Sequence, residues 1–200
     1  VNAAADAAHD FAGWSGDAGG TANPLAVLMD RNRTVQALFA PKVFSLVTSA
    51  SAGGSVTPGG NYPYGTIVTV VAGANTTHRF AGWTGDASGM SPTITLTVTH
   101  TLSVHALFEP KAAQTIQFPA IADQSVGTSV PLNVTSTSGL PVTLSVSGPA
   151  TFADGVLTLT GPGSVSIQAT QGGDDYYLPA VPVTRAFNTA APAVLKYSTQ

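Results

Sequence analysis

Hydrophobic and polar residues alternate with a period of two along most of this chain. In residues 93–99, Ile94, Leu96 and Val98 alternate with threonines. Successive side chains of a β-strand point to opposite faces of the sheet, so this alternation predicts a half-buried strand. The same pattern predicts strands at 43–49, 66–72, 78–83 and 102–108. No segment shows the 3.6-residue period of a helix of normal length, and the Gly-rich segment 51–65 predicts turns.

One stretch of the sequence occurs twice. HRFAGWTGDASG (78–89) repeats HDFAGWSGDAGG (9–20), which lies 69 residues earlier. The offset holds without a gap from Val1 against Val70 to Lys42 against Lys111, and 18 of the 42 aligned positions are identical. Self-similarity at a fixed period marks a repeated structural module. The stretch is therefore interpreted as part of a recurring module and not as a unique active site.

The repeated motif predicts a structural framework. Trp83 is expected to cover a core that is too small to be closed by aliphatic residues alone. Gly82 and Gly85 would let the chain turn sharply beside it at the end of the strand, and Asp86 would accept backbone N–H bonds in that turn. Contact between Trp83 and a ligand is the alternative. The framework residues of the two copies are Phe11, Trp14, Asp17, Phe80, Trp83 and Asp86.

The first copy is expected to be incomplete. Val1 aligns with Val70, near the end of a strand, so the counterpart of residues 43–69 is missing from residues 1–42. A sheet that lacks a strand exposes unpaired N–H and C=O groups. We therefore expect the chain to be a slice of a longer tandem array, in which preceding residues or a neighbouring chain complete the first copy.

Residues 24–30 of the first copy keep the alternation of their counterpart at 93–99. Leu25, Val27 and Met29 fall on one face, which predicts a strand there as well.

Several separated elements of the second copy resemble a known repeat. They are a Gly-Gly-Ser-Val turn (53–56), a tyrosine before Gly-Thr (64–66), and the phrases VTVVA, RFAGWTGDASG, ITLTV and ALFEP in this order. The chain resembles the divergent internalin B-type repeat of bacterial surface and secreted proteins, completely over 43–111 and as the C-terminal part of a copy over 1–42. The resemblance implies a compact β-grasp-like module that is used in tandem, usually without catalytic activity.

From residue 112 onward the pattern changes to short alternating strands between Gly/Pro turns, at the spacing of a β-sandwich. The phrases QTIQFPAIADQSVG, SGLPVTLSVSGPA and GGDDYYLPA resemble cysteine-free immunoglobulin-like domains of bacterial surface and secreted proteins. We predict such a sandwich over 112–190, followed by a linker over 191–200. Its predicted core is Ile116, Phe118, Leu132, Val134, Val142, Leu144, Val146, Val156, Leu157, Leu159, Val165, Ile167 and Phe187. The predicted fold class is thus all-β, with tandem small β-modules and an immunoglobulin-like sandwich.

Composition narrows the class of partner. Only 8% of the residues are charged and the net charge is -3, which provides no basic surface for nucleic acid. Cysteine is absent, so thiol chemistry and disulfide bonds are excluded. No apolar run is long enough to span a bilayer, so membrane insertion is not expected. Abundant Ser, Thr, Gly and Ala among Val and Leu is typical of secreted bacterial β-modules, and we expect a secreted or cell-surface location.

Candidate chemistry is sparse. The sequence contains no His-x-x-x-His pair, no Asp-x-Asp loop and no nucleophile elbow, so we expect no catalytic site and no cofactor. His100 and His105 are expected on opposite faces of their segment, which does not make a ligand pair. Asp174 and Asp175 are weak candidates for a calcium site, and the alternative is an acidic turn between two strands.

Aromatic side chains are the remaining candidates for binding. Tyr62 and Tyr64 in the Gly-rich segment, and Tyr176 and Tyr177, would present a flat apolar ring with a polar tip to a polysaccharide or a surface protein. The alternative is that Tyr64 closes the core and Tyr62 covers a turn. Two functions follow. One is a structural spacer or stalk that contacts neighbouring modules of the same chain, and the other is an accessory adhesion or carbohydrate-binding module that uses exposed aromatics or a sheet edge.

Overall fold

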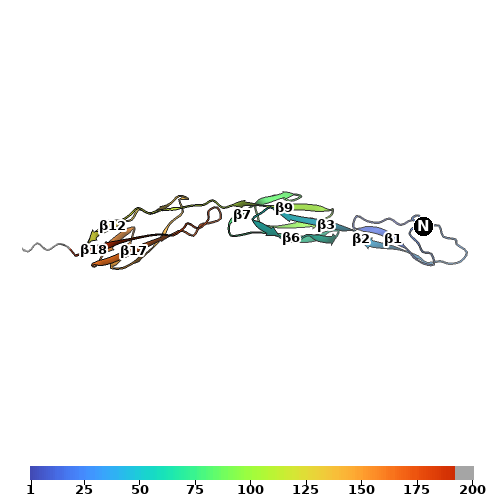
Figure 1. Ribbon diagram of the computed structural model, residues 1–200. Helices are drawn as coiled ribbons and strands as arrows, with labels where there is room; N and C mark the ends of the chain where they lie inside the picture. The colour runs from blue at the N-terminus through green and yellow to red at the C-terminus, as the bar shows by residue number, and fades with distance from the viewer. Residues whose placement is uncertain (192–200) are drawn as a thin grey trace, which may run out of the picture. The chain divides into compact units, whose positions relative to one another are not determined.

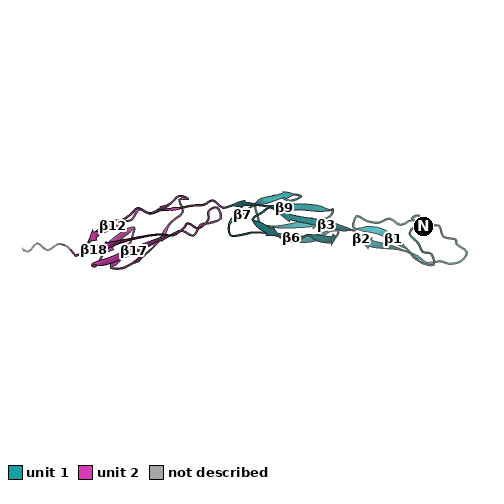
Figure 2. Ribbon diagram, viewed as in Figure 1, with its two compact units in different colours: residues 1–110 teal, residues 111–200 magenta. Residues whose placement is uncertain are grey.

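The computed structural model describes residues 1–191 of the 200-residue chain, and within them it shows an all-β protein without a helix (Figure 1). The predicted fold class is therefore confirmed. The described part of the chain accordingly offers no helix that could span a membrane. The chain divides into two compact units, residues 1–110 and residues 111–200 (Figure 2). The linker was predicted at 191–200, and only residue 191 of it is among the described residues.

The second repeat, residues 43–110, consists of two sheets. The four-stranded sheet has the order β5-β3-β9-β7 and the three-stranded sheet has the order β4-β6-β8. β3 and β9 pair in parallel, and every other pair in these sheets is antiparallel. The strands are β3 (Val43–Ala50), β4 (Gly54–Val56), β5 (Gly60–Pro63), β6 (Thr66–Ala74), β7 (His78–Gly85), β8 (Thr93–Val98) and β9 (Leu102–Pro110). The five strands predicted in this repeat are confirmed, whereas β4 and β5 lie in the segment that the sequence predicts as turns.

The core of the second repeat lies between these two sheets. Leu102, Val104, Ala106 and Phe108 of β9 are buried, as the alternation predicts. They pack with residues of both sheets, and the buried members of this cluster are Leu46, Val70, Ala72, Trp83, Val98, Leu102, Val104, Ala106 and Phe108. The period of two thus places one face of each strand in the core.

The first repeat contains one two-stranded sheet, formed by β1 (His9–Gly16) and β2 (Val35–Pro41). The strand predicted at 24–30 is wrong, because these residues form no strand. In the second repeat the corresponding strand β8 pairs with β6, whose counterpart here is reduced to the first few residues. The backbones of Val1 and Leu25 still exchange two hydrogen bonds of 2.8 Å, but Leu28 and Met29 are exposed. An alternating segment without a paired neighbour does not become a strand.

A single residue joins the two repeats. Lys42 is the one residue between β2 and β3; its N–H donates to the Ala8 carbonyl and its carbonyl accepts from the Tyr64 N–H, both at 2.8 Å. Each side of this residue is therefore hydrogen-bonded to a different repeat, which limits rotation at the junction.

The second unit has a four-stranded sheet of order β11-β18-β17-β14 and a three-stranded sheet of order β12-β16-β15, with β10 and β13 as an additional pair. Residues of both larger sheets meet in one core, as in a β-sandwich. The strands are β10 (Ile116–Gln117), β11 (Gln124–Ser125), β12 (Ser129–Pro131), β13 (Thr135–Ser136), β14 (Thr143–Ser147), β15 (Ala150–Ala153), β16 (Val156–Leu159), β17 (Gly163–Thr170) and β18 (Val183–Ala190).

The predicted core of this sandwich is confirmed with one correction. Ile116, Leu157 and Ile167 are among its buried members, and most of the others pack against them. Val156 is the one predicted member that does not join this cluster, because it precedes the buried Leu157 and successive residues of β16 face opposite sides.

Candidate functional site

The tryptophan of the repeated motif is held inside the second repeat. Trp83 is 4% exposed, and its Nε1–H donates to the Ser91 carbonyl at 2.8 Å. Its backbone N–H donates to the Gly89 carbonyl at 3.2 Å. The first repeat has the same arrangement, with Trp14 Nε1 at 2.9 Å from the Ala22 carbonyl oxygen. The loop after the strand is thus tied to the indole in both copies.

Three aromatic rings pack in series in each copy. The Phe80 ring lies 5.4 Å from Trp83 and 5.9 Å from Phe108, measured between ring centroids. In the first repeat, Phe11 lies 5.3 Å from Trp14 and 6.0 Å from Phe39. Tilted and edge-to-face pairs at these distances are favourable beyond their burial of area.

The aspartate of the motif ties the end of β7 to the start of β9. The N–H of Ser103 donates to Asp86 Oδ2 at 2.7 Å, and the Asp86 N–H donates to the Ser103 carbonyl at 2.8 Å. Asp17 makes the same two bonds with Thr34, each at 2.7 Å. The side chain accepts a backbone N–H, as predicted, although that N–H belongs to a neighbouring strand.

The two glycines of the motif have different roles. Gly85 approaches the Ser103 backbone with a φ of +87°, at the end of β7. Gly82 does not turn the chain at the strand end, which corrects the prediction. It lies in a β-bulge opposite Leu107, and β7 continues through Trp83 to Gly85. A bulge keeps the strand paired while it changes the direction in which the next side chain points.

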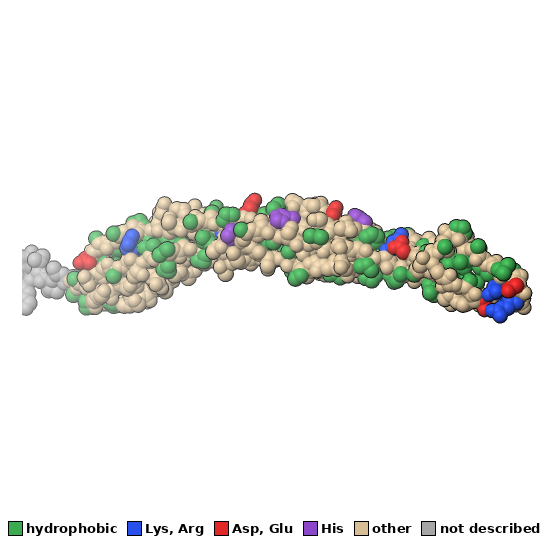
Figure 3. Space-filling model, turned by 45° about the vertical axis from the view of Figure 1, so that its right-hand side comes forward, with side chains coloured by type: hydrophobic (Ala, Val, Ile, Leu, Met, Phe, Trp, Pro, Cys, Tyr) green, Lys and Arg blue, Asp and Glu red, His purple; other side chains and the backbone are tan. Residues whose placement is uncertain are grey.

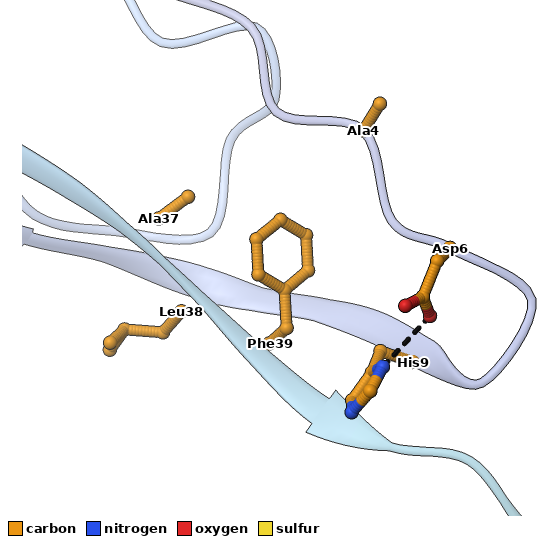
Figure 4. Close-up of a pocket in the computed structure, with 6 residues that line it drawn as sticks. All are labelled: Ala4, Asp6, His9, Ala37, Leu38 and Phe39. Carbon is orange, nitrogen blue, oxygen red and sulfur yellow. Dashed lines mark hydrogen bonds and ion pairs between the residues drawn. The ribbon is translucent and has the colours of Figure 1, made fainter.

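A pocket of about 450 Å³ opens on the first repeat. Its walls come from the segment before β1, the first residue of β1 and β2, and it is lined by Ala4, Asp6, His9, Ala37, Leu38 and Phe39 (Figure 4). In Figure 4 the Phe39 ring points toward the Ala4–Asp6 segment, and Leu38 points the other way. His9 Nδ1 lies 2.8 Å from Asp6 Oδ1, and this hydrogen bond lowers the pKa of Asp6 below its ordinary value.

The corresponding space of the second repeat is filled by residues 51–54. The Ser51 hydroxyl accepts a hydrogen bond of 2.8 Å from the Phe108 N–H, and the Gly53 carbonyl accepts one of 2.8 Å from the Asn75 N–H. Gly53 lies so close to the His78 ring that a Cβ would overlap it. A Cβ on Gly54 would likewise overlap the ring of Phe108. Residues 1–42 contain no counterpart of this segment.

β2 of the first repeat has one neighbouring strand among the described residues. Among the described residues β2 pairs only with β1, whereas its counterpart β9 pairs with β3 as well as β7. Phe39 is 41% exposed, compared with 7% for its counterpart Phe108. We call residues 33–39 together with the pocket the open edge. The sequence predicted an unpaired edge but not this pocket. The signal that could have located the pocket is the alignment of His9 with His78, because Gly53 packs against His78 and has no counterpart beside His9.

We expect the open edge to bind a strand of the kind that fills the second repeat. A synthetic peptide with the sequence of residues 43–56 should slow amide hydrogen exchange of residues 33–39 toward the rate of residues 102–108. The parallel pairing of β3 with β9 supplies the hydrogen bonds. The matched control is the same peptide with both glycines corresponding to Gly53 and Gly54 replaced by valine, which should not bind. The prediction is wrong if residues 33–39 of the free chain already exchange as slowly as residues 102–108.

The four tyrosine candidates do not form one surface. Tyr62 is half-buried against the core of the second repeat, and the Tyr64 ring lies 6.4 Å from the Phe44 ring. In the second unit Tyr176 is 60% exposed, whereas Tyr177 is half-buried and forms a β-bridge with Ala112. Binding through these rings stays a prediction.

Asp174 and Asp175 of the second unit lie in a turn. Asp174 Oδ1 accepts hydrogen bonds from the N–H groups of Tyr176 and Tyr177, at 2.7 and 2.8 Å, which uses this oxygen to stabilise the turn. Asp175 is exposed beside it. Within residues 1–191, no group of three or more His, Asp or Glu side chains is arranged to hold a metal ion.

We expect the second unit to fold without calcium. Addition of EDTA should leave its melting temperature unchanged, because a turn carboxylate that already accepts two backbone N–H groups has little need of a cation. Calorimetry of the full chain with EDTA, and with added calcium as the control, measures this. A fall of more than about 5 °C in EDTA would instead reveal a structural ion, since about 1 kcal/mol of binding energy shifts a domain of this size by that amount.

The surface shown in Figure 3 carries few charges between uncharged polar atoms and scattered hydrophobic side chains. Several of the charges are paired, including Arg33 with Asp30 at 2.7 Å and Arg79 with Glu109. His105 is half-buried on β9 and bonds to the Ser49 hydroxyl, whereas His100 is exposed in the preceding turn. Ion pairs on the surface, such as Arg33 with Asp30, add little stability.

These features define a protein of tandem β-modules, in which the repeated side chains build the fold. Comparison with protein families agrees: the divergent InlB B-repeat domain matches residues 1–43 and 44–112, more than half of the chain, and the chain belongs to this family. The family is associated with bacterial surface or secreted proteins and is typically non-catalytic. The match does not extend over the sandwich, whose relation to bacterial immunoglobulin-like domains stays a prediction. A search among curated proteins found no match.

Proposed function

We propose that this chain is a non-catalytic spacer segment of a bacterial surface or secreted protein, in which its modules hold neighbouring domains apart. The path of the chain through the second repeat carries the proposal. The chain enters at Val43, the start of β3, and leaves at Pro110, the end of β9. The two strands are parallel with Leu46 opposite Leu102, so entry and exit lie at opposite ends of the sheet. At about 3.3 Å per strand residue, they are separated by roughly 35 Å.

The second unit supports the same proposal. Ala112, at the start of this unit, forms a β-bridge with Tyr177, which precedes the last strand β18. β18 ends at Ala190, which lies opposite Ser125. The chain again enters at one end of the module and leaves at the other. A module of this kind adds its own length to the distance between the domains on either side, whereas a module with adjacent ends adds almost none.

The alternative function is an accessory adhesion or carbohydrate-binding module. The exposed ring of Tyr176 favours it, because an aromatic face can stack on a sugar ring.

A binding screen with the full chain separates the two functions. The spacer predicts no specific retention on a glycan array or in a polysaccharide pull-down. Tyr62→Ala, Tyr64→Ala and Tyr176→Ala are the test variants, and Phe152→Ala, which removes another partly exposed ring, is the matched control. Specific retention that a tyrosine variant abolishes and Phe152→Ala preserves would replace the spacer by a binding module.

A further inference from the structure

The first and the last strand of the second repeat are direct neighbours. β3 pairs with β9 in parallel through five residue pairs, from Leu46 opposite Leu102 to Ala50 opposite Ala106. In the order β5-β3-β9-β7 they are the two central strands of their sheet. Each of them is therefore also held by an outer strand, β3 by β5 and β9 by β7.

This arrangement determines how the module meets a pulling force. Tension enters through the residue before Val43 and leaves through the residue after Pro110. It therefore pulls β3 toward its start and β9 toward its end, in opposite directions along nearly parallel axes. The evenly spaced hydrogen bonds of a parallel pair are then loaded together. Antiparallel terminal strands that end on the same side would instead be peeled apart, one bond after another.

Further contacts join the same two segments. The Ser51 N–H donates to the Ala106 carbonyl at 2.9 Å, and the Ser51 hydroxyl accepts from the Phe108 N–H at 2.8 Å. The side chains of Leu46 and Val104 are buried on the core side of the pair. Burial limits the access of water, which would otherwise replace a stretched bond.

The second unit also places a leading and a trailing segment in parallel, although β11 lies at the edge of its sheet. Ala112 bridges to Tyr177 in parallel, and Gln124 and Ser125 of β11 pair in parallel with Thr189 and Ala190 of β18. The two residues of each pair are 65 positions apart in the sequence. The segment 112–125 therefore keeps one register alongside residues 177–190.

Side chains strengthen this contact in the second unit. Asp123 Oδ1 accepts from the Asn188 N–H at 2.7 Å. Buried Gln114 donates to the Leu178 carbonyl, also at 2.7 Å.

We infer that residues 43–110 and 112–190 are modules that withstand mechanical tension, in which a parallel pair of leading and trailing segments resists a force applied through the chain ends. The inference rests on the proposed spacer function, because a spacer between a surface and an attached domain transmits any force between them.

Pulling one module in two directions tests this inference. The chain has no cysteine, so two cysteines introduced into the full chain define the attachment points for optical tweezers. Val43→Cys with Pro110→Cys loads β3 and β9 along their length. Val43→Cys with Thr101→Cys pulls on the starts of both strands and peels them apart. All three side chains are exposed, so both variants keep the core.

The lengthwise rupture force should be at least about twice the peeling force, because five pairs share the load in one direction and break in turn in the other. The rupture force in such an experiment depends on the unfolding barrier and not on the equilibrium free energy of unfolding. A difference in force between the two pulling directions therefore reflects the direction of loading. Ser51→Ala should lower only the lengthwise force, and Thr66→Ala, which removes a hydroxyl bond outside the β3–β9 pair, should lower neither. Equal forces in the two directions would overturn the inference and leave the spacer proposal standing, whereas specific glycan retention would overturn the spacer without changing the force ratio.

Discussion

Replacement of Trp83 by alanine is expected to destabilise the second repeat by about 3–5 kcal/mol, the range for truncation of a large buried aromatic. The side chain is almost completely buried and packs against Phe80. Its removal also leaves the Ser91 carbonyl without the indole N–H. The melting transition of residues 43–110 should fall by at least about 12 °C. Calorimetry of the full chain measures the shift, and amide hydrogen exchange assigns it to this repeat.

Two variants serve as controls for this experiment. Ile67→Ala removes a side chain that is 70% exposed in the same module and should have little effect. Trp14→Ala makes the identical change in the first repeat and should leave the transition of residues 43–110 in place. A Trp83→Ala transition within about 2 °C of the parent would mean that the indole adds no packing energy, and the ligand-contact interpretation would return.

Gly85→Ala is expected to cost about 2–4 kcal/mol from two separate causes. The first is backbone conformation, because a φ of +87° is unfavourable for a residue with a Cβ. The second is space, because that Cβ would overlap the carbonyl oxygen of Ser103 on the neighbouring strand. Relief of the overlap requires β9 to shift, which also strains the bonds between Asp86 and Ser103. Chemical denaturation of the full chain, followed by hydrogen exchange within residues 78–110, measures the loss.

Gly65→Ala separates these causes. Gly65 has a φ of +82°, nearly the same as Gly85, but no heavy atom lies within 4 Å of the position of its added Cβ. Its substitution should cost only the conformational part, about 1–2 kcal/mol. Equal losses in the two variants would contradict the proposed role of the close approach between β7 and β9.

The Trp-x-Gly-Asp framework shows why part of this structure was predictable. The repeat at an offset of 69 residues identified Trp83 and Asp86 as framework residues, and both make the same bonds as their counterparts Trp14 and Asp17. A repeated tryptophan with its glycines is informative because it must satisfy the same local geometry twice. The candidate binding residues carried no such signal: Tyr62, Tyr64, Tyr176 and Tyr177 have no repeated counterpart within residues 1–200 and lie in different surroundings.

The segment 24–30 shows where the local pattern fails. Its alternation is that of a strand, as is the alternation of β8 (93–98), which forms one. The difference lies in the partner: β8 has the whole of β6 beside it, whereas Leu25 meets only Val1. Alternation describes which faces a strand would present, but the hydrogen bonds that stabilise a strand come from another segment. The alternation alone does not carry that information, although the alignment of Val1 with Val70 already places most of the partner strand outside residues 1–42.

The sequence by itself determined the all-β class, the repeat, the burial of alternate residues in strands such as β9, and the framework role of the tryptophan. These properties depend on side-chain direction and backbone preference within a few residues, or on comparison of the chain with itself. Only the tertiary structure decided that β3 lies parallel to β9, that residues 51–54 fill a space which is open in the first repeat, and that Gly82 forms a bulge. Each of these depends on which distant segment lies alongside, and that choice is made by the packing of the whole module.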